Sequence, residues 1–194
     1  MDLHLTVEII LLAGNIKKDC RQQHQRQTSQ HRMNRLIYYW WIPDYKKFSP
    51  SGREYSENMR FAPKQGRGVC EVASWLSDDL PTGINSVNIW INNLTDLEHS
   101  RAPDGMFGIG NAHWVLIKGD YVFIGTEYVE EQQVIMTREQ LLYVLEQYKT
   151  FLEGDYNDPN NPPDPIDVEF IAEGQEAIDM YNGLEGSQLV PYAC

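Results

Sequence analysis

The sequence predicts a single α+β domain, a mainly antiparallel sheet with two to three helices packed against it. Short β-branched and aromatic runs recur along the chain, and one amphipathic helix with clear start and stop signals directly follows such a run. No internal repeat is visible. The 194 residues suffice for one domain with its own core, and an aromatic content of 11% is typical of a chain that folds.

The N-terminal residues 1–32 differ from the rest of the chain. Residues 16–32 are polar, Gln-rich and without apolar periodicity. We expect residues 1–32 to be a polar extension, disordered or non-native, with Met33 the natural start and residues 33–194 the globular acidic domain. The apolar run at residues 5–13 is interrupted by Glu8 and has no basic region before it, so no secretion signal is predicted. No stretch approaches the roughly 20 apolar residues of a membrane-spanning helix, and we expect a cytoplasmic protein.

The first half of the domain is predicted to alternate strands and a helix. Residues 36–42 are β-branched and aromatic and end at Pro43, which indicates a strand. Residues 44–68 contain several Pro and Gly breakers and are predicted to form a long loop. Residues 69–80 have helical spacing and stop at Pro81. Residues 86–91 alternate apolar and other side chains, which favours a strand.

The second half contains the clearest elements. Residues 113–117 and 121–124 predict a hairpin, and because neither arm alternates with polar residues we expect it in the middle of the sheet, covered on both faces. Residues 134–136 continue as a strand into a helix that begins with a capping box, Thr137 and Gln140, and ends at Gly154. Its apolar face comprises Leu141, Val144, Leu145, Tyr148 and Leu152. An acidic, Pro-rich loop (155–165), a strand (168–171) and a short helix (173–181) are predicted to follow.

One pair of residues has the chemistry of a nucleophile and a base. Cys70 is predicted near a helix start, where the dipole lowers thiol pKa values, and His113 opens a strand. Gly68-Val69-Cys70 followed by Asn111-Ala112-His113-Trp114 resembles the papain-like fold. That resemblance implies an orienting third group, for which Asp120 or Glu127 is available, and an oxyanion-hole amide, for which Gln65 is available. The alternative is that Cys70 packs as a small hydrophobe and His113 is a half-buried structural histidine.

Metal and cofactor sites are not predicted. The segment Asp155-Tyr156-Asn157-Asp158 lacks the glycine and the bidentate glutamate of a calcium loop, and no spacing places two good ligands on one helical face. The three cysteines, Cys20, Cys70 and Cys194, are an odd number without a paired motif, which indicates a reducing compartment.

The distribution of charge is more informative about function than the candidate catalytic and metal-binding residues. The net charge is -12, and because residues 1–32 hold five Lys or Arg against three Asp or Glu, the acidity belongs to residues 33–194. Residues 127–185 contain 15 Asp or Glu against Arg138 and Lys149. Such a field disfavours nucleic acid and anionic membranes and favours a basic protein. The alternative is a solvated acidic face. The predicted partner-binding residues are Glu127, Tyr128, Glu130, Glu131, Asp155, Tyr156 and Asp158.

A strand that runs into the helix Thr137-Arg138-Glu139-Gln140-Leu141-Leu142 of a small acidic domain resembles bacterial immunity proteins of polymorphic toxin systems, of the contact-dependent inhibition or Rhs type. The resemblance implies a protein that binds a cognate toxin, commonly a basic nuclease, and blocks its active site. Two other interpretations stay open. One is a papain-like cysteine hydrolase or deamidase that uses Cys70, His113 and Glu127, and the other is an acidic adaptor without inhibitory activity.

Overall fold

The computed structural model describes residues 35–53, 66–80, 83–95, 105–109, 112–126 and 132–184. The expected extension, residues 1–32, lies outside these residues. The described elements, in chain order, are β1 (Leu36–Ile42), η1 (Pro43–Tyr45), β2 (Lys47–Ser51), α2 (Arg67–Asp78), α3 (Ile84–Thr95), β3 (Gly105–Ile109), β4 (His113–Lys118), β5 (Tyr121–Thr126), β6 (Val134–Thr137), α4 (Arg138–Glu153), β7 (Ile166–Asp167), β8 (Ala172–Glu173) and α5 (Gln175–Gly183).

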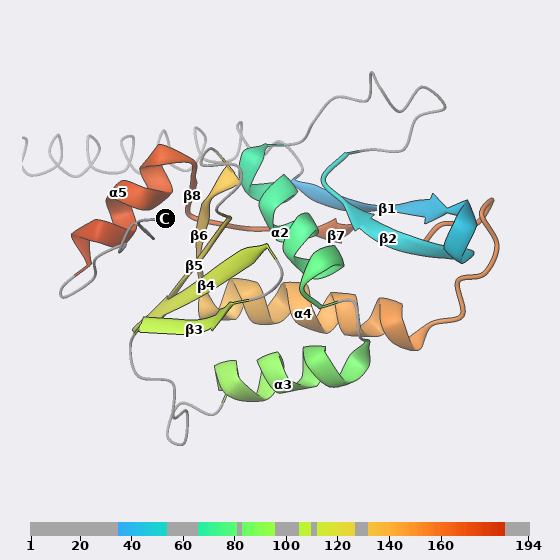
Figure 1. Ribbon diagram of the computed structural model, residues 1–194, viewed down its shortest axis with the longest axis horizontal. Coiled ribbons are helices and arrows are strands. Elements are labelled where there is room, and N and C mark those ends of the chain that lie inside the picture. Colours follow the sequence, from blue (N-terminus) through green and yellow to red (C-terminus); the bar gives the residue numbers. More distant parts are fainter. Residues whose placement is uncertain are drawn as a thin grey trace, which may run out of the picture. The chain divides into compact units, whose positions relative to one another are not determined.

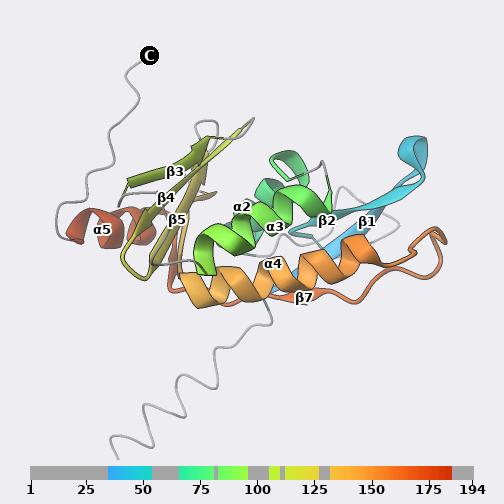
Figure 2. The ribbon, with the colours of Figure 1, turned by 90° about the horizontal axis from the view of Figure 1, so that it is seen from below.

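The strands form two antiparallel sheets (Figure 1). The smaller sheet has the order β2-β1-β7 and the larger has the order β3-β4-β5-β6-β8. Helix α2 contacts strands of both sheets, and α3 and α4 lie side by side in both views (Figures 1 and 2). The predicted α+β class is therefore confirmed, with four α-helices in the described part of the chain.

The hairpin β4–β5 occupies the middle of the larger sheet, as predicted. On β5, Val122 and Ile124 belong to the large core shared with α2 and α4, while Phe123 points to the opposite face and packs on Tyr181 of α5. Helices thus cover both faces of this strand. The unbroken apolar run at residues 122–124 is the expected result, because neither face meets water there.

Helix α4 has the predicted start, face and end. The Gln140 backbone N–H donates to Thr137 Oγ1 at 3.1 Å, and the Thr137 N–H donates to Gln140 Oε1 at 2.9 Å. This is a complete capping box, which satisfies two backbone donors that the helix leaves unpaired. The helix buries four of the five predicted positions, and the N–H of Gly154 closes its last turn on the Phe151 carbonyl.

The predicted strand at residues 86–91 is wrong, because these residues lie within helix α3. Val87 and Leu94 are buried, and Trp90 and Ile91 pack against the core between them. That spacing of three, four and seven residues is helical. Ile89, which completed the apparent alternation, is 59% exposed, so the alternation was coincidental.

The predicted loop at residues 44–68 contains strand β2, which pairs with β1 through the η1 turn. β2 is an edge strand, where Pro50 needs no ladder partner. The predicted strand at 168–171 is also displaced. The residues on either side of this segment in the sequence form two short strands. The preceding strand, β7, pairs with β1 in the smaller sheet, and the following strand, β8, pairs with β6 in the larger one. Residues 168–171 cross between the two sheets, so no single ladder contains them.

Candidate functional site

The start of α2 is fixed by a residue distant in sequence. Gly66, the N-cap, offers no side chain, and the backbone N–H of Gly68 donates instead to the Glu173 carboxylate of β8 at 2.5 Å. A Cβ on Gly68 would lie 2.8 Å from the Phe170 ring, so only glycine fits there. The Glu173 side chain of β8 therefore caps the N-terminal end of α2.

Cys70 faces the smaller sheet. Its Sγ lies 3.7 Å from the Gly52 carbonyl oxygen, and a Cβ on Gly52 would lie 2.6 Å from Cys70 Cα. The half-buried thiol opens into a cleft of about 330 Å³, which is also lined by Trp40, Arg53 and Gln132. Cys70 is thus positioned by a close backbone approach between α2 and the residue that follows β2.

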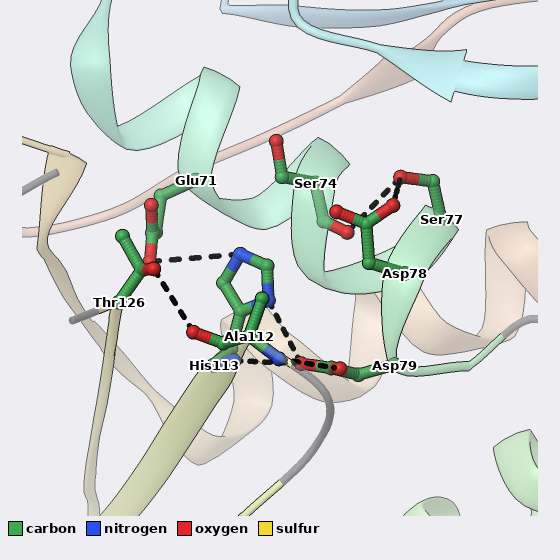
Figure 3. A network of polar contacts seen from close by, with 8 residues as sticks. All are labelled: Glu71, Ser74, Ser77, Asp78, Asp79, Ala112, His113 and Thr126. Carbon is green, nitrogen blue, oxygen red and sulfur yellow. Dashed lines mark hydrogen bonds and ion pairs between the residues drawn. The ribbon is translucent and has the colours of Figure 1, made fainter. Parts of the chain in front are cut away.

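The next residue, Glu71, faces the larger sheet instead. Consecutive side chains of a helix point about 100° apart, so Cys70 and Glu71 lie on different faces of α2. His113 lies between Glu71 and Asp79, the C-cap of α2 (Figure 3). His113 Nδ1 is 2.8 Å from Asp79 Oδ2, and Nε2 is 3.9 Å from Glu71 Oε1. We call Glu71, Asp79 and His113 the buried network, since their side chains are at most 3% exposed.

Asp79 holds the end of α2 against the beginning of β4. Its carboxylate accepts the backbone N–H groups of Ala112 at 3.3 Å and His113 at 3.1 Å, in addition to the His113 ring. Because the carboxylate only accepts, the ring proton lies on Nδ1 and the Nε2 side faces Glu71. Several charge-assisted bonds to one carboxylate make Asp79 a strong tertiary connection.

Glu71 is the least solvated group of this network. It is 0% exposed, and neither carboxyl oxygen has a hydrogen-bond partner in the described residues. Burial, reinforced by the nearby charge of Asp79, raises the pKa of Glu71 to about 9. The carboxyl group is therefore protonated and neutral at pH 7. A neutral acid beside His113 avoids the cost of an additional buried charge.

Cys70 and His113 do not form a nucleophile–base pair in this arrangement. Both ring nitrogens of His113 face carboxyl groups, and the ring is 3% exposed. The orienting acid is Asp79, which precedes His113, whereas we expected Asp120 or Glu127 after it. Asp120 is exposed in the β4–β5 turn, and Gln65 and Glu127 lie outside the described residues. Sequence reasoning missed Glu71 and Asp79 because both look like ordinary acids on a helix.

We find no family model, curated protein or solved structure that matches this chain. The fold and side-chain geometry therefore carry the functional argument. In the described part of the chain, no helix is long and apolar enough to cross a membrane. The same residues contain no group of three His, Cys, Asp or Glu side chains placed to hold a metal ion.

The predicted partner-binding residues fall into two groups. Glu127, Tyr128, Glu130 and Glu131 lie outside the described residues, whereas Asp155 and Asp158 are described and exposed. Local hydrogen bonds order both carboxylates: Asn157 donates to Asp155 at 3.0 Å, and the backbone of Asn160 donates to Asp158 at 2.9 Å. They are therefore fixed, outward-facing charges.

Tyr156, one of the predicted partner-binding residues, and Tyr181 both contribute to packing. Tyr156 is half-buried and stacks on Phe151 at a centroid distance of 5.5 Å. Tyr181 is only 3% exposed and belongs to the core beneath α5. The tyrosines thus anchor acidic segments from within, and Tyr156 offers a partner only part of its surface.

Residues 153–169 form one continuous acidic segment, which we call the acidic strap. All its carboxylates are exposed: Glu153, Asp155, Asp158, Asp164, Asp167 and Glu169. Residues 150–184 contain no Lys or Arg. In the second half of the strap, exposed acids alternate with buried side chains of Ile166 and Val168. The Val168 N–H also donates to the Arg35 carbonyl at 2.7 Å, so the core and strand β1 hold the charged face outward.

Proposed function

We propose that this chain is a non-enzymatic binding protein that takes a basic protein partner on the acidic strap. The observation that carries the proposal is the strap itself: six exposed carboxylates on a segment that buried apolar residues hold in place, with no basic residue among them. A pre-ordered charged surface binds without the entropy cost of ordering a loop. Its negative field accelerates encounter with a positively charged partner.

We further propose that the partner is a toxin domain, as in bacterial immunity proteins of the contact-dependent inhibition or Rhs type, and that the pair meets in the cytoplasm. A nuclease that binds phosphates has a basic groove, and ordered carboxylates are suited to occupy it. Asp155, Tyr156 and Asp158 are the described members of the predicted partner-binding set. Glu127, Tyr128, Glu130 and Glu131, which lie outside the described residues, remain part of the proposed partner-binding set.

The geometry favours this proposal over a papain-like hydrolase. A general base must reach the proton that it abstracts, so a catalytic His113 would have a ring nitrogen directed at the Cys70 thiol. His113 has carboxyl groups at both nitrogens, whereas the Cys70 thiol faces the Gly52 carbonyl. Asp79 instead gives His113 a structural role, because it joins α2 to β4.

The test begins with the neighbouring gene. We expect this chain to be encoded directly beside a large gene that ends in a toxin domain, and co-expression of the chain to restore growth of cells that express that domain. A double substitution, Asp155→Lys with Asp158→Lys, should weaken the protection, while the matched change Asp120→Lys in the β4–β5 turn should preserve it. Full protection by the double variant, or no protection by the unmodified chain, would contradict the proposal.

A further inference from the structure

A second, smaller cleft lies where β2 meets the C-terminal half of α4. Its volume is about 210 Å³, below the roughly 300–1,000 Å³ of pockets that hold drug-sized ligands. Phe48 lies on the β2 side, and Tyr148, Phe151 and Tyr156 line the α4 side. Phe151 stacks with Tyr148 at 5.8 Å and with Tyr156 at 5.5 Å. The cleft therefore has the size for one side chain, and aromatic rings form part of its lining.

The electrostatic surroundings of the cleft favour a cation. It lies at the C-terminal end of α4, where the helix dipole is negative, and the last turn of α4 contains no basic residue. Leu152 and Gly154 line the cleft, and the exposed carboxylates of Glu153 and Asp155 are their chain neighbours. Among the lining residues the one cation is Lys47, and its Nζ lies 5.6 Å from the centroid of the Tyr45 ring.

A buried hydroxyl beside the cleft adds an independent observation. Tyr39 is 4% exposed, and its Oη has no hydrogen-bond partner in the described part of the chain. Its ring packs on Phe151 at 4.2 Å. Burial raises the pKa of Tyr39 well above its usual range, and the phenols of Tyr148 and Tyr156 add to the shift. Tyr39 thus supports Phe151, one of the rings that line the cleft, from the core.

We propose that this cleft receives an arginine side chain of the basic protein partner, an inference that rests on the function proposed above. A guanidinium is planar, weakly hydrated and able to stack on aromatic rings, whereas an ammonium is a compact, strongly hydrated charge. The half-buried ring of Tyr156, which lines the cleft, would accept the flat face, and the exposed carboxylates of Glu153 and Asp155 would pair with the edge. The cleft would select arginine while the strap supplies attraction for any cation.

The probes are fluorescein-labelled hexa-arginine, hexa-lysine and hexa-citrulline peptides, with Kd measured by fluorescence anisotropy at about 0.15 M salt. The unmodified chain should bind hexa-arginine at least about fivefold more tightly than hexa-lysine, and hexa-citrulline least. Ser49→Phe, which fills the cleft without a change of charge, should remove the preference for arginine over lysine. Asp164→Asn with Asp167→Asn should weaken both cationic peptides by the same factor.

A second variant covers the case in which Ser49→Phe does not fold. Phe151→Leu removes one ring and should also equalise the two cationic peptides. Equal binding of both by the unmodified chain, or a preference that survives the cleft variants, would overturn the arginine site and leave the acidic binding surface standing. No binding of either cationic peptide would overturn both proposals.

Discussion

The buried network and the acidic strap place the same chemical group in opposite surroundings. In the network, the carboxyl groups of Asp79 and Glu71 are buried between α2 and β4, and burial raises the pKa of Glu71 to about 9. In the strap, Asp155, Asp164 and Asp167 face solvent, while buried residues beneath them hold the backbone. Carboxyl groups thus stabilise tertiary contacts in the buried network, whereas in the acidic strap they are exposed charges on the surface.

This difference distinguishes the carboxylates that stabilise the fold from those that are exposed to a binding partner. A carboxylate that accepts several buried donors contributes to stability, and its loss leaves those donors unpaired. An exposed carboxylate contributes little to stability, so its substitution changes binding without unfolding the protein. The predictions for Asp79 and for the acidic strap separate these two roles.

The largest effect is expected from Asp79→Ala. This change leaves the His113 ring and two backbone N–H groups without their acceptor, which should lower the free energy of unfolding by about 3–5 kcal/mol. The matched change Asp78→Ala, at the exposed neighbour, should cost less than about 1 kcal/mol. Urea denaturation of both variants measures the difference, and equal losses would show that the network is not the stabilising connection.

Gly52→Ala tests the packing of α2 against the smaller sheet. A Cβ there would lie 2.6 Å from Cys70 Cα, a contact that backbone must move to relieve, so a loss of about 1–3 kcal/mol is expected. Gly183→Ala is the control, because a Cβ at that glycine meets nothing within 4 Å. Thermal unfolding of the two variants should differ clearly. Identical midpoints would contradict the close approach.

Glu71→Gln should change how stability depends on pH. The folded pKa of Glu71, about 9, lies above the ordinary value of 4.5, so between these values the folded protein holds one more proton than the unfolded chain. The stability that protonated Glu71 contributes to the fold is fully present below pH 4.5 and is lost as the pH rises toward 9. The slope is about 1.4 kcal/mol per pH unit for one proton.

Glutamine mimics the neutral acid and cannot ionise, so Glu71→Gln should flatten this decline and be more stable than the unmodified chain at pH 8. Denaturation curves between pH 5 and 8 provide the measurement, with Glu146→Gln on the exposed face of α4 as the control. Parallel profiles for Glu71→Gln and the unmodified chain would mean that Glu71 is ionised in the fold.

The sequence predicted the elements whose signals are local. The capping box at Thr137 and the uninterrupted apolar hairpin β4–β5 have the expected structure because neighbouring residues alone specify them. α3 was misassigned because Val87, Ile89 and Ile91 fit a strand period over six residues, and only packing reveals that Ile89 is exposed. Strand β2 was missed because its pairing with β1 depends on tertiary contact at a sheet edge.

The candidate site was less predictable than the fold. Cys70 and His113 have the residue types of a catalytic pair, but helical rotation turns Cys70 to one sheet and Glu71 to the other. The contact between Asp79 and His113 spans 34 residues, and nothing local indicates it. The acidic character of the strap was visible in the sequence. Its ordered presentation follows from the alternation of buried and exposed residues after residue 162.

The smallest effect on stability is expected in the strap. Asp164→Lys with Asp167→Lys should change the free energy of unfolding by less than about 1 kcal/mol, because both side chains are exposed. A loss similar to that of Asp79→Ala would show that the strap is structural, and the contrast between the two regions would then fail. Urea denaturation under the conditions used for Asp79→Ala allows a direct comparison.

The most direct test of the central claim is the association rate of this chain with the partner proposed above, a basic toxin domain, measured by stopped-flow at low and physiological ionic strength. We expect the rate to fall as salt rises, and Asp164→Lys with Asp167→Lys to slow association roughly three- to tenfold at low salt, while Asp120→Lys has a smaller effect. A rate that is independent of salt and unchanged by the strap substitutions would contradict the account.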